Sequence, residues 1–160
     1  MNTAVLTRTL TVNAAFLAEI KEDNFRLREL LSEGADDAAH GNLGRITVRE
    51  RVELYFAIRD QLGLHFALED AYGYFHDAIE EQPWLAKNAK KLQSQHDILF
   101  RQLCVVVDAA ECILYREYNA IRVKELLEAF MEFYARLAEH EHAENELILA
   151  AFDDDIGVGD

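Results

Sequence analysis

The sequence is poor in the two residues that interrupt helices. Pro83 is the only proline among 160 residues, and the seven glycines lie mostly outside the apolar segments. Proline removes a backbone donor and glycine costs backbone entropy, so both weaken helix interiors. No long segment alternates between apolar and polar residues, which argues against a β-sheet. These absences favour long helices.

The sequence also lacks long apolar runs and has only two cysteines. No segment approaches the roughly 20 apolar residues of a membrane span, and residues 1–16 lack the apolar centre of a signal peptide. Cys104 and Cys112 lie in one predicted helix, about 12 Å apart along its axis, which is too far for a disulfide. We therefore expect no membrane partner and a reducing, cytoplasmic environment.

Basic residues are scarce relative to acidic ones. The 16 lysines and arginines stand against 30 aspartates and glutamates, so the formal net charge is -14. An acidic surface without a basic patch repels phosphate backbones, so nucleic acid is not expected as a partner. The charges are dispersed along the predicted helices, which is typical of a solvated surface. This surface is compatible with a monomer or a weak homo-oligomer.

The sequence does contain apolar residues at helical spacing. About half of the residues (51%) are apolar, and the length fits one domain with a real core. We predict a single domain over residues 1–160, with its core at about residues 16–152. The apolar stripes predict four helices, at about residues 16–33, 48–81, 84–115 and 120–152.

Local signals place the ends of these helices. Gly34 is expected to end the first helix, and residues 35–46 are expected to form a loop. Thr47, with Glu50 three residues later, forms a capping box for the second helix, and Pro83 follows its end. Residues 1–15, rich in threonine and valine, are expected to form a short N-terminal arm. The sequence thus predicts an all-α, antiparallel up-down four-helix bundle.

Three of the six histidines, His65, His96 and His140, lie on the apolar stripes. The other three are expected outside any shared site. His40 is in the predicted loop. His142 is two residues from His140 and points about 200° away around the helix. His76 lies on the face of His65 but about 16 Å further along the axis.

Two of the three stripe histidines are followed four residues later by a glutamate, as His65 with Glu69 and His140 with Glu144. Four residues turn a helix by about 400°, so each pair emerges on one face. Imidazole nitrogen with carboxylate oxygen suits iron, manganese or zinc, and no pair of cysteines indicates a structural zinc site. A lone core histidine usually only packs, but an unpaired buried carboxylate is costly. We therefore favour a metal site over a purely structural polar core.

An internal repeat singles out position 24. His140 lies 44 residues after His96, and the corresponding step back from His65 reaches Asn24, 41 residues earlier. The segment from Asn24 to Leu31 also aligns with the segment from His96 to Leu103. The repeat therefore predicts a histidine at position 24, where this chain has an amide that needs a partner.

These motifs resemble the hemerythrin-like (HHE) family, whose members are built from two repeated hairpins, each with a histidine and an HxxxE. The resemblance covers roughly residues 16–152 and rests on three pieces of sequence: His65-Phe-Ala-Leu-Glu69, His96 and His140-Glu-His-Ala-Glu144. It implies a non-haem iron site in the bundle core. His96 and His140 would hold one iron and His65 the other, with Glu69 and Glu144 as bridging carboxylates.

The chain departs from the family at Asn24, which could offer only a weak carbonyl oxygen or hold a water bound to the metal. Two irons are expected from the resemblance, and a single iron is the alternative that Asn24 leaves open. Phenylalanine at position 66 removes one further carboxylate. Asp70 is a candidate acid behind the ligands, and Tyr72 could donate a hydrogen bond to a bound ligand or simply pack.

Three functions remain open from the sequence. The resemblance implies an iron protein that binds O2, NO or peroxide as a carrier, store or sensor. An iron-dependent enzyme that processes peroxide or NO would use the same open coordination position. A metal-free helical scaffold for a protein partner is the third, and Asn24 is its best support. A ferritin-like oxidase is disfavoured, because that class uses Glu-x-x-His pairs.

Overall fold

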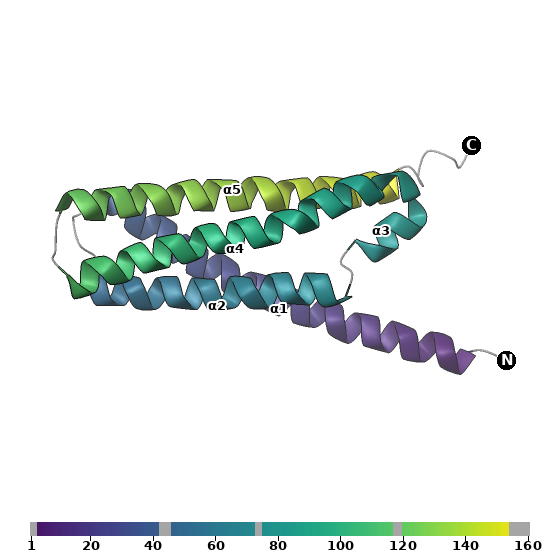
Figure 1. Ribbon diagram of the computed structural model, residues 1–160. Helices are drawn as coiled ribbons and strands as arrows, with labels where there is room; N and C mark the ends of the chain where they lie inside the picture. Colours follow the sequence, from purple (N-terminus) through teal and green to yellow (C-terminus); the bar gives the residue numbers. More distant parts are fainter. Residues whose placement is uncertain (1–2, 42–45, 73–74, 117–119, 154–160) are drawn as a thin grey trace.

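The computed structural model of this chain describes residues 3–41, 46–72, 75–116 and 120–153. Within these ranges it contains four long helices, one short helix and one 3-10 turn, and no strand (Figure 1). The elements are α1 (Thr3–His40), α2 (Val48–Tyr72), α3 (His76–Glu81), η2 (Pro83–Leu85), α4 (Ala86–Tyr115) and α5 (Ala120–Asp153). The predicted all-α class with four long helices is therefore confirmed.

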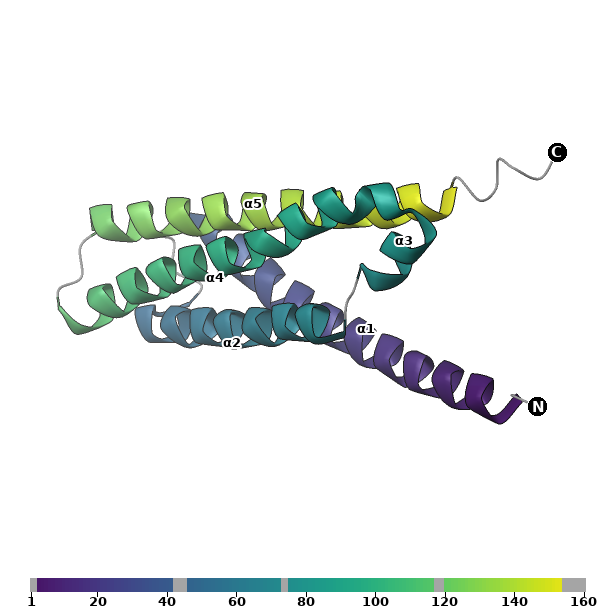
Figure 2. The ribbon, with the colours of Figure 1, turned by 45° about the vertical axis from the view of Figure 1, so that its right-hand side comes forward.

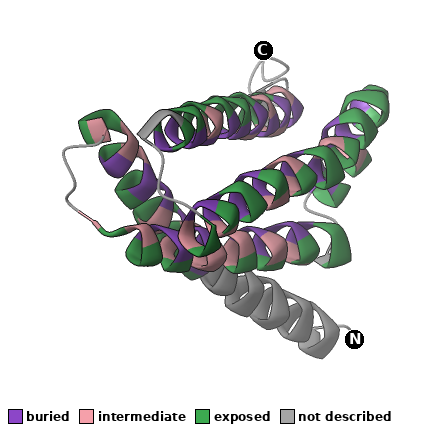
Figure 3. Cartoon of the chain, turned by 60° about the vertical axis from the view of Figure 1, so that its left-hand side comes forward, coloured by how far each residue is buried: buried purple, intermediate pink, exposed green. Residues whose placement is uncertain are grey.

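Each long helix packs against two others. Helix α4 contacts α2 and α5, and α1 contacts the same two helices from the other side (Figure 2). In the oblique view of Figure 3, the buried residues of the long helices lie mainly on the sides that face the other helices. Most of the core is apolar, so burial of these stripes drives the assembly.

The core consists of two apolar clusters with a polar layer between them. The larger cluster includes Leu99 of α4 and Leu137 of α5. The smaller one includes Leu92 of α4 and Leu147 of α5, and it also takes in α3. The stripe histidines lie between these leucines on both helices. The chain thus places its polar layer where apolar side chains exclude water on both sides.

The start of α2 confirms the predicted capping box. The Thr47 backbone N–H donates to Glu50 Oε2 at 2.6 Å, and the Glu50 N–H donates to Thr47 Oγ1 at 3.1 Å. These two bonds satisfy donors that the first turn of a helix leaves free. The predicted break between the last two helices is confirmed as well, since α4 ends at Tyr115 and α5 begins at Ala120.

The predictions for the first helix were wrong at both ends. The expected N-terminal arm is part of α1, which begins at Thr3. Threonine and valine cost a helix only a few tenths of a kcal/mol each, so their abundance does not prevent one. Helix α1 also runs through Gly34 to His40 and ends before Gly41, whose positive φ of 60° is the usual helix stop. The loop therefore takes much less of residues 35–46 than expected.

The second helix is shorter than predicted. Helix α2 ends at Tyr72, and residues 76–81 form the separate helix α3. Phe75 and Ala78 are buried in the smaller apolar cluster with Leu147 and Ala151 of α5. The apolar stripe on residues 76–81 thus covers the end of α5 instead of extending α2. Periodicity alone does not reveal such a change of direction.

Gly34 lies inside α1 because the Phe130 ring packs directly on its backbone. A Cβ at position 34 would overlap that fully buried ring. We expect Gly34→Ala to lower the free energy of unfolding by about 1–2 kcal/mol, since the overlap outweighs the gain in helix propensity. Gly63→Ala in α2 is the matched control. Its Cβ would meet only the edge of the partly buried Phe100 ring, 3.2 Å away, so it should stabilise slightly. Urea unfolding distinguishes them, and a more stable Gly34→Ala would contradict this account.

Candidate metal centre

The structure brings the five predicted ligands together from three helices. His65 and Glu69 come from α2, His96 from α4, and His140 and Glu144 from α5. Each of the five is at most 4% exposed. The two HxxxE pairs meet because one-turn spacing keeps each pair on the inward face of its helix.

The imidazoles and carboxylates alternate in space. Glu69 touches two histidines with different oxygens: Oε1 lies 2.8 Å from His65 Nε2, and Oε2 lies 3.2 Å from His96 Nε2. Glu144 uses one oxygen for both of its contacts, since Oε1 lies 3.2 Å from His96 Nε2 and 2.9 Å from His140 Nε2. Glu69 therefore spans both ends of the site, whereas these contacts place Glu144 at the His96–His140 end.

His96, His140 and Glu144 form the tighter end of the site. Their ligand atoms all lie within 4.8 Å of one another, which is close enough to surround one metal ion. The other end holds His65 and one oxygen of Glu69. The site is thus asymmetric in its protein donors.

Each of the three histidines has an oxygen at its outer ring nitrogen. The Nδ1 atoms of His65, His96 and His140 lie 3.3 Å from Asp23 Oδ2, 3.0 Å from Asp70 Oδ1 and 2.9 Å from Gln95 Oε1. An acceptor there holds the proton on Nδ1 and leaves the Nε2 lone pair directed inward. This is the usual arrangement of a metal-binding histidine.

Two buried atoms at the centre of the site lack hydrogen bonds. They are Glu69 Oε2 and His140 Nε2, each near a partner but not aligned for a hydrogen bond. Burying such atoms unpaired costs free energy. A cation between them would satisfy both, so the donor set fits a bound metal ion.

Without a metal, protons on the histidines compensate the negative charges of the two buried carboxylates. Burial lowers the pKa of His96, but its close contacts with the Glu144 and Glu69 carboxylates more than offset this and raise it to about 10. Burial raises the pKa of Glu69, but its close contacts with the His65 and His96 imidazoles lower it to about 2. Burial also lowers the pKa of His65. The neighbouring Glu69 and Asp23 carboxylates raise this pKa by more, so it lies above its usual value. A metal ion must therefore displace protons at neutral pH.

These shifts predict how the stability of the metal-free protein depends on pH. The pKa of His96 is raised from 6.5 to about 10, so its contribution is complete below pH 6.5 and lost as pH rises through about 10. The pKa of Glu69 is lowered from 4.5 to about 2, so its contribution is present above pH 4.5 and lost as pH falls through about 2. We expect the network to stabilise the metal-free protein most at pH 4.5–6.5.

The measurement is thermal unfolding with a chelator present, for wild type and His96→Gln. The difference in Tm between the two should shrink as pH rises from 6.5 to 10. The His96→Gln comparison removes pH effects of the acidic surface, which both proteins share. A difference that stays constant over this range would contradict the proton assignment.

Helix α1 contributes Asp23 to the site rather than Asn24. Asp23 is buried, contacts His65, and also accepts a hydrogen bond from the Gln61 side-chain amide. Asn24 is half-buried and has no hydrogen bond among the described side chains. One residue turns a helix by about 100°, so the two side chains cannot serve the same role.

The structure places the remaining sequence candidates as follows. Asp70 lies behind His96, as its expected role requires. The side chain of Tyr72 falls outside the described residues. His76 and His142 are exposed and lie near Glu80 and Glu146 of their own helices, and His40 is hydrogen-bonded to the Asp36 carbonyl.

Sequence reasoning missed Asp23, Gln61 and Gln95, and it treated Phe66 only as a missing carboxylate. The Phe66 ring stacks on His96 with a centroid distance of 4.2 Å and meets His140 edge-on at 5.9 Å. It thus fixes ring orientations from the apolar side. Asp23 could have been found from its spacing, because it lies four residues before Leu27 on the buried stripe. No comparable signal marks Gln95.

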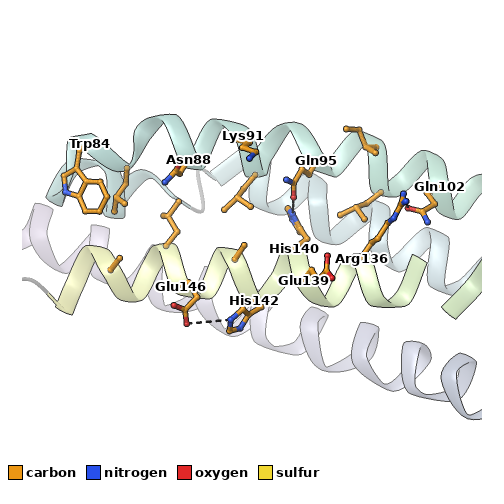
Figure 4. A pocket seen from close by; sticks show the side chains of 17 residues that line it. Trp84, Asn88, Lys91, Gln95, Gln102, Arg136, Glu139, His140, His142 and Glu146 are labelled. Carbon is orange, nitrogen blue, oxygen red and sulfur yellow. Dashed lines mark hydrogen bonds and ion pairs between the residues drawn. The ribbon is translucent and has the colours of Figure 1, made fainter. Parts of the chain in front are cut away.

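A cleft of about 880 Å³ between α4 and α5 leads to the site (Figure 4). Gln95 and His140 meet on its inner wall, and Arg136 and Trp84 line it further out. The cleft gives a small molecule a route to one of the ligand histidines.

No known family model, curated protein or solved structure matches this chain. Among the helices of the described ranges, none combines the length and apolar character that crossing a bilayer requires.

Proposed function

We propose that this chain is a hemerythrin-like, non-haem iron protein that binds O2, NO or peroxide as a carrier, store or sensor. The site that holds the metal consists of His65, Glu69, His96, His140 and Glu144. The proposal includes an antiparallel up-down arrangement of the four long helices, which the helix pairing supports. It also includes a cytoplasmic location, which the two free cysteines support.

One observation carries the proposal. Three buried imidazoles direct Nε2 at two buried carboxylates, while an oxygen occupies each Nδ1. A purely structural network has no need to leave Glu69 Oε2 and His140 Nε2 without hydrogen bonds. Mixed nitrogen and oxygen donors without thiolates suit iron among the common metals.

The residues of the site and those around it would have different roles in binding. Bound iron would supply an open coordination position for a small ligand and, where needed, one-electron chemistry. His96, His140 and Glu144 form the tighter group of donors, and Glu69 links them to His65. Phe66 and the leucines on either side exclude bulk water, while the cleft beside Gln95 admits a small ligand.

The test is elemental analysis of the purified protein, with ultraviolet–visible spectra of the oxidised form before and after azide is added. We expect bound iron and a charge-transfer band that changes with azide, because azide binds at an open position. About two irons per chain would indicate that both ends are occupied, and about one iron a single site at His96 and His140. No bound iron, even after anaerobic reconstitution with ferrous iron, would refute the proposal and leave a helical scaffold.

A further inference from the structure

The cleft between α4 and α5 is much larger than a diatomic or peroxide ligand requires. Its volume is about 880 Å³, whereas a molecule of the size of water occupies about 30 Å³. Buried leucines of both helices line it, and two large apolar side chains on its wall, Trp84 and Ile98, are each 61% exposed. Mainly apolar clefts of about 300–1,000 Å³ typically bind small organic molecules. The size and the wall of this cleft therefore fit an organic ligand.

The polar groups that the cleft offers to such a ligand are hydrogen-bond donors. Gln95 and Gln102 of α4 both line the cleft, and the side-chain oxygen of each already faces α5. Gln95 Oε1 lies 2.9 Å from His140 Nδ1, and Gln102 Oε1 accepts a hydrogen bond from Arg136 Nη1 at 3.4 Å. Neither amide nitrogen has a hydrogen bond within the described part of the chain. Since an amide nitrogen can only donate, the complementary group on a ligand is an acceptor oxygen.

The charges around the cleft do not favour an ion of either sign. Lys91 and Arg136 line the cleft with the acids Glu139 and Glu146, and His142 lies 4.0 Å from Glu146. Two permanent cations thus face two acids. The whole chain carries a formal net charge of -14, so its field does not attract anions either. This balance favours an uncharged ligand.

We propose that the cleft binds an uncharged organic molecule whose carbonyl oxygen accepts a hydrogen bond from the Gln95 amide and whose apolar body lies along α4. Gln95 is half-buried on the inner wall, and Leu92 and Ile98 line the cleft one turn before and one turn after it (Figure 4). Gln102 supplies a second donor about 10 Å further along the axis. This site is additional to the proposed iron site, and its ligand does not need the metal.

The experiment is equilibrium dialysis of the full, metal-free chain against a neutral ketone, 2-acetonaphthone, and against 2-ethylnaphthalene, which lacks the carbonyl. Wild type is expected to bind one ketone per chain. Gln95→Glu keeps an oxygen beside His140 but loses the amide N–H groups. It should bind the ketone about tenfold more weakly and the hydrocarbon as wild type does. Asn145→Asp makes the same change of charge at an exposed position of α5 outside the cleft wall, so it should bind both probes as wild type does.

A second pair of variants tests the apolar wall. Ile98→Ser should weaken the binding of both probes at least about threefold, because it removes apolar surface from the wall. Val105→Ser is the matched control, since Val105 lies seven residues further along α4, is 67% exposed and does not line the cleft. The melting temperatures of all variants show whether each chain folds.

Three outcomes would overturn the inference. The first is no binding of the ketone by wild type up to the solubility limit of the ketone. The second is an equal effect of Gln95→Glu on the ketone and the hydrocarbon, which would show that Gln95 does not hold the carbonyl. The third is tighter binding of 2-naphthoate than of the ketone, which would show that the ligand is an anion. None of these results depends on iron content, so this proposal and the iron proposal fail independently.

Discussion

Replacing His96 with alanine is expected to remove nearly all bound metal, lowering the affinity by more than about 100-fold. His96 Nε2 lies 3.2 Å from both Glu69 and Glu144. Among the five ligands it is the side chain whose contacts reach both carboxylates. Its loss therefore takes a donor from the His96–His140 group and separates that group from Glu69. Elemental analysis after dialysis against a weak chelator measures the effect.

Two further variants make this result specific. His142→Ala removes an exposed imidazole two residues from His140 and should keep wild-type metal content. Asn24→Ala should also change little, because Asn24 contacts no ligand. His96→Gln repeats the test with a polar side chain that packs better than alanine. Metal content equal to that of wild type in both His96 variants would show that the ligand assignment is wrong.

Asp37→Ala is expected to cost about 3–5 kcal/mol of the free energy of unfolding, the largest stability effect we predict. The Arg51 guanidinium donates two hydrogen bonds to Asp37, at 2.6 and 2.9 Å. Both side chains are about 5% exposed or less. Removing the carboxylate leaves a cation buried without its main counter-charge, which is much worse than losing an exposed ion pair.

The control is Asp97→Ala, which breaks a pair of similar length with Arg101 on the surface. Those side chains are more than three-quarters exposed, so the cost should stay below about 1 kcal/mol. Asp37→Ala with Arg51→Met should recover part of the loss, since an apolar side chain then replaces the buried cation that has lost its main counter-charge. Equal costs for the two aspartates in urea unfolding would refute the buried-pair argument. Metal content should not change, because neither residue contacts the ligands.

The fold was predictable where a local rule decided it. The capping box at Thr47 and Glu50 follows from two residues that are three positions apart in the sequence. The extent of α1 was not predictable, because Gly34 is held in the helix by Phe130, nearly a hundred residues later. Likewise, the pair between Asp37 and Arg51 could not be seen from a sequence whose residues 35–46 indicated a loop.

The sequence by itself determined which side chains could act as ligands. A step of four residues places His65 above Glu69, and His140 above Glu144, on one face of any α-helix, because the backbone geometry is local. The same geometry put His142 on the other side of its helix from His140.

Only the tertiary structure decided which groups complete the site. Asp23, Asp70 and Gln95 reach the three histidines from neighbouring helices, across 42, 26 and 45 residues of chain. Whether Asp23 or Asn24 faces His65 depends on a rotation of about 100° of α1 about its axis. That rotation is set by how α1 packs between α2 and α5, and no local pattern in the sequence records it.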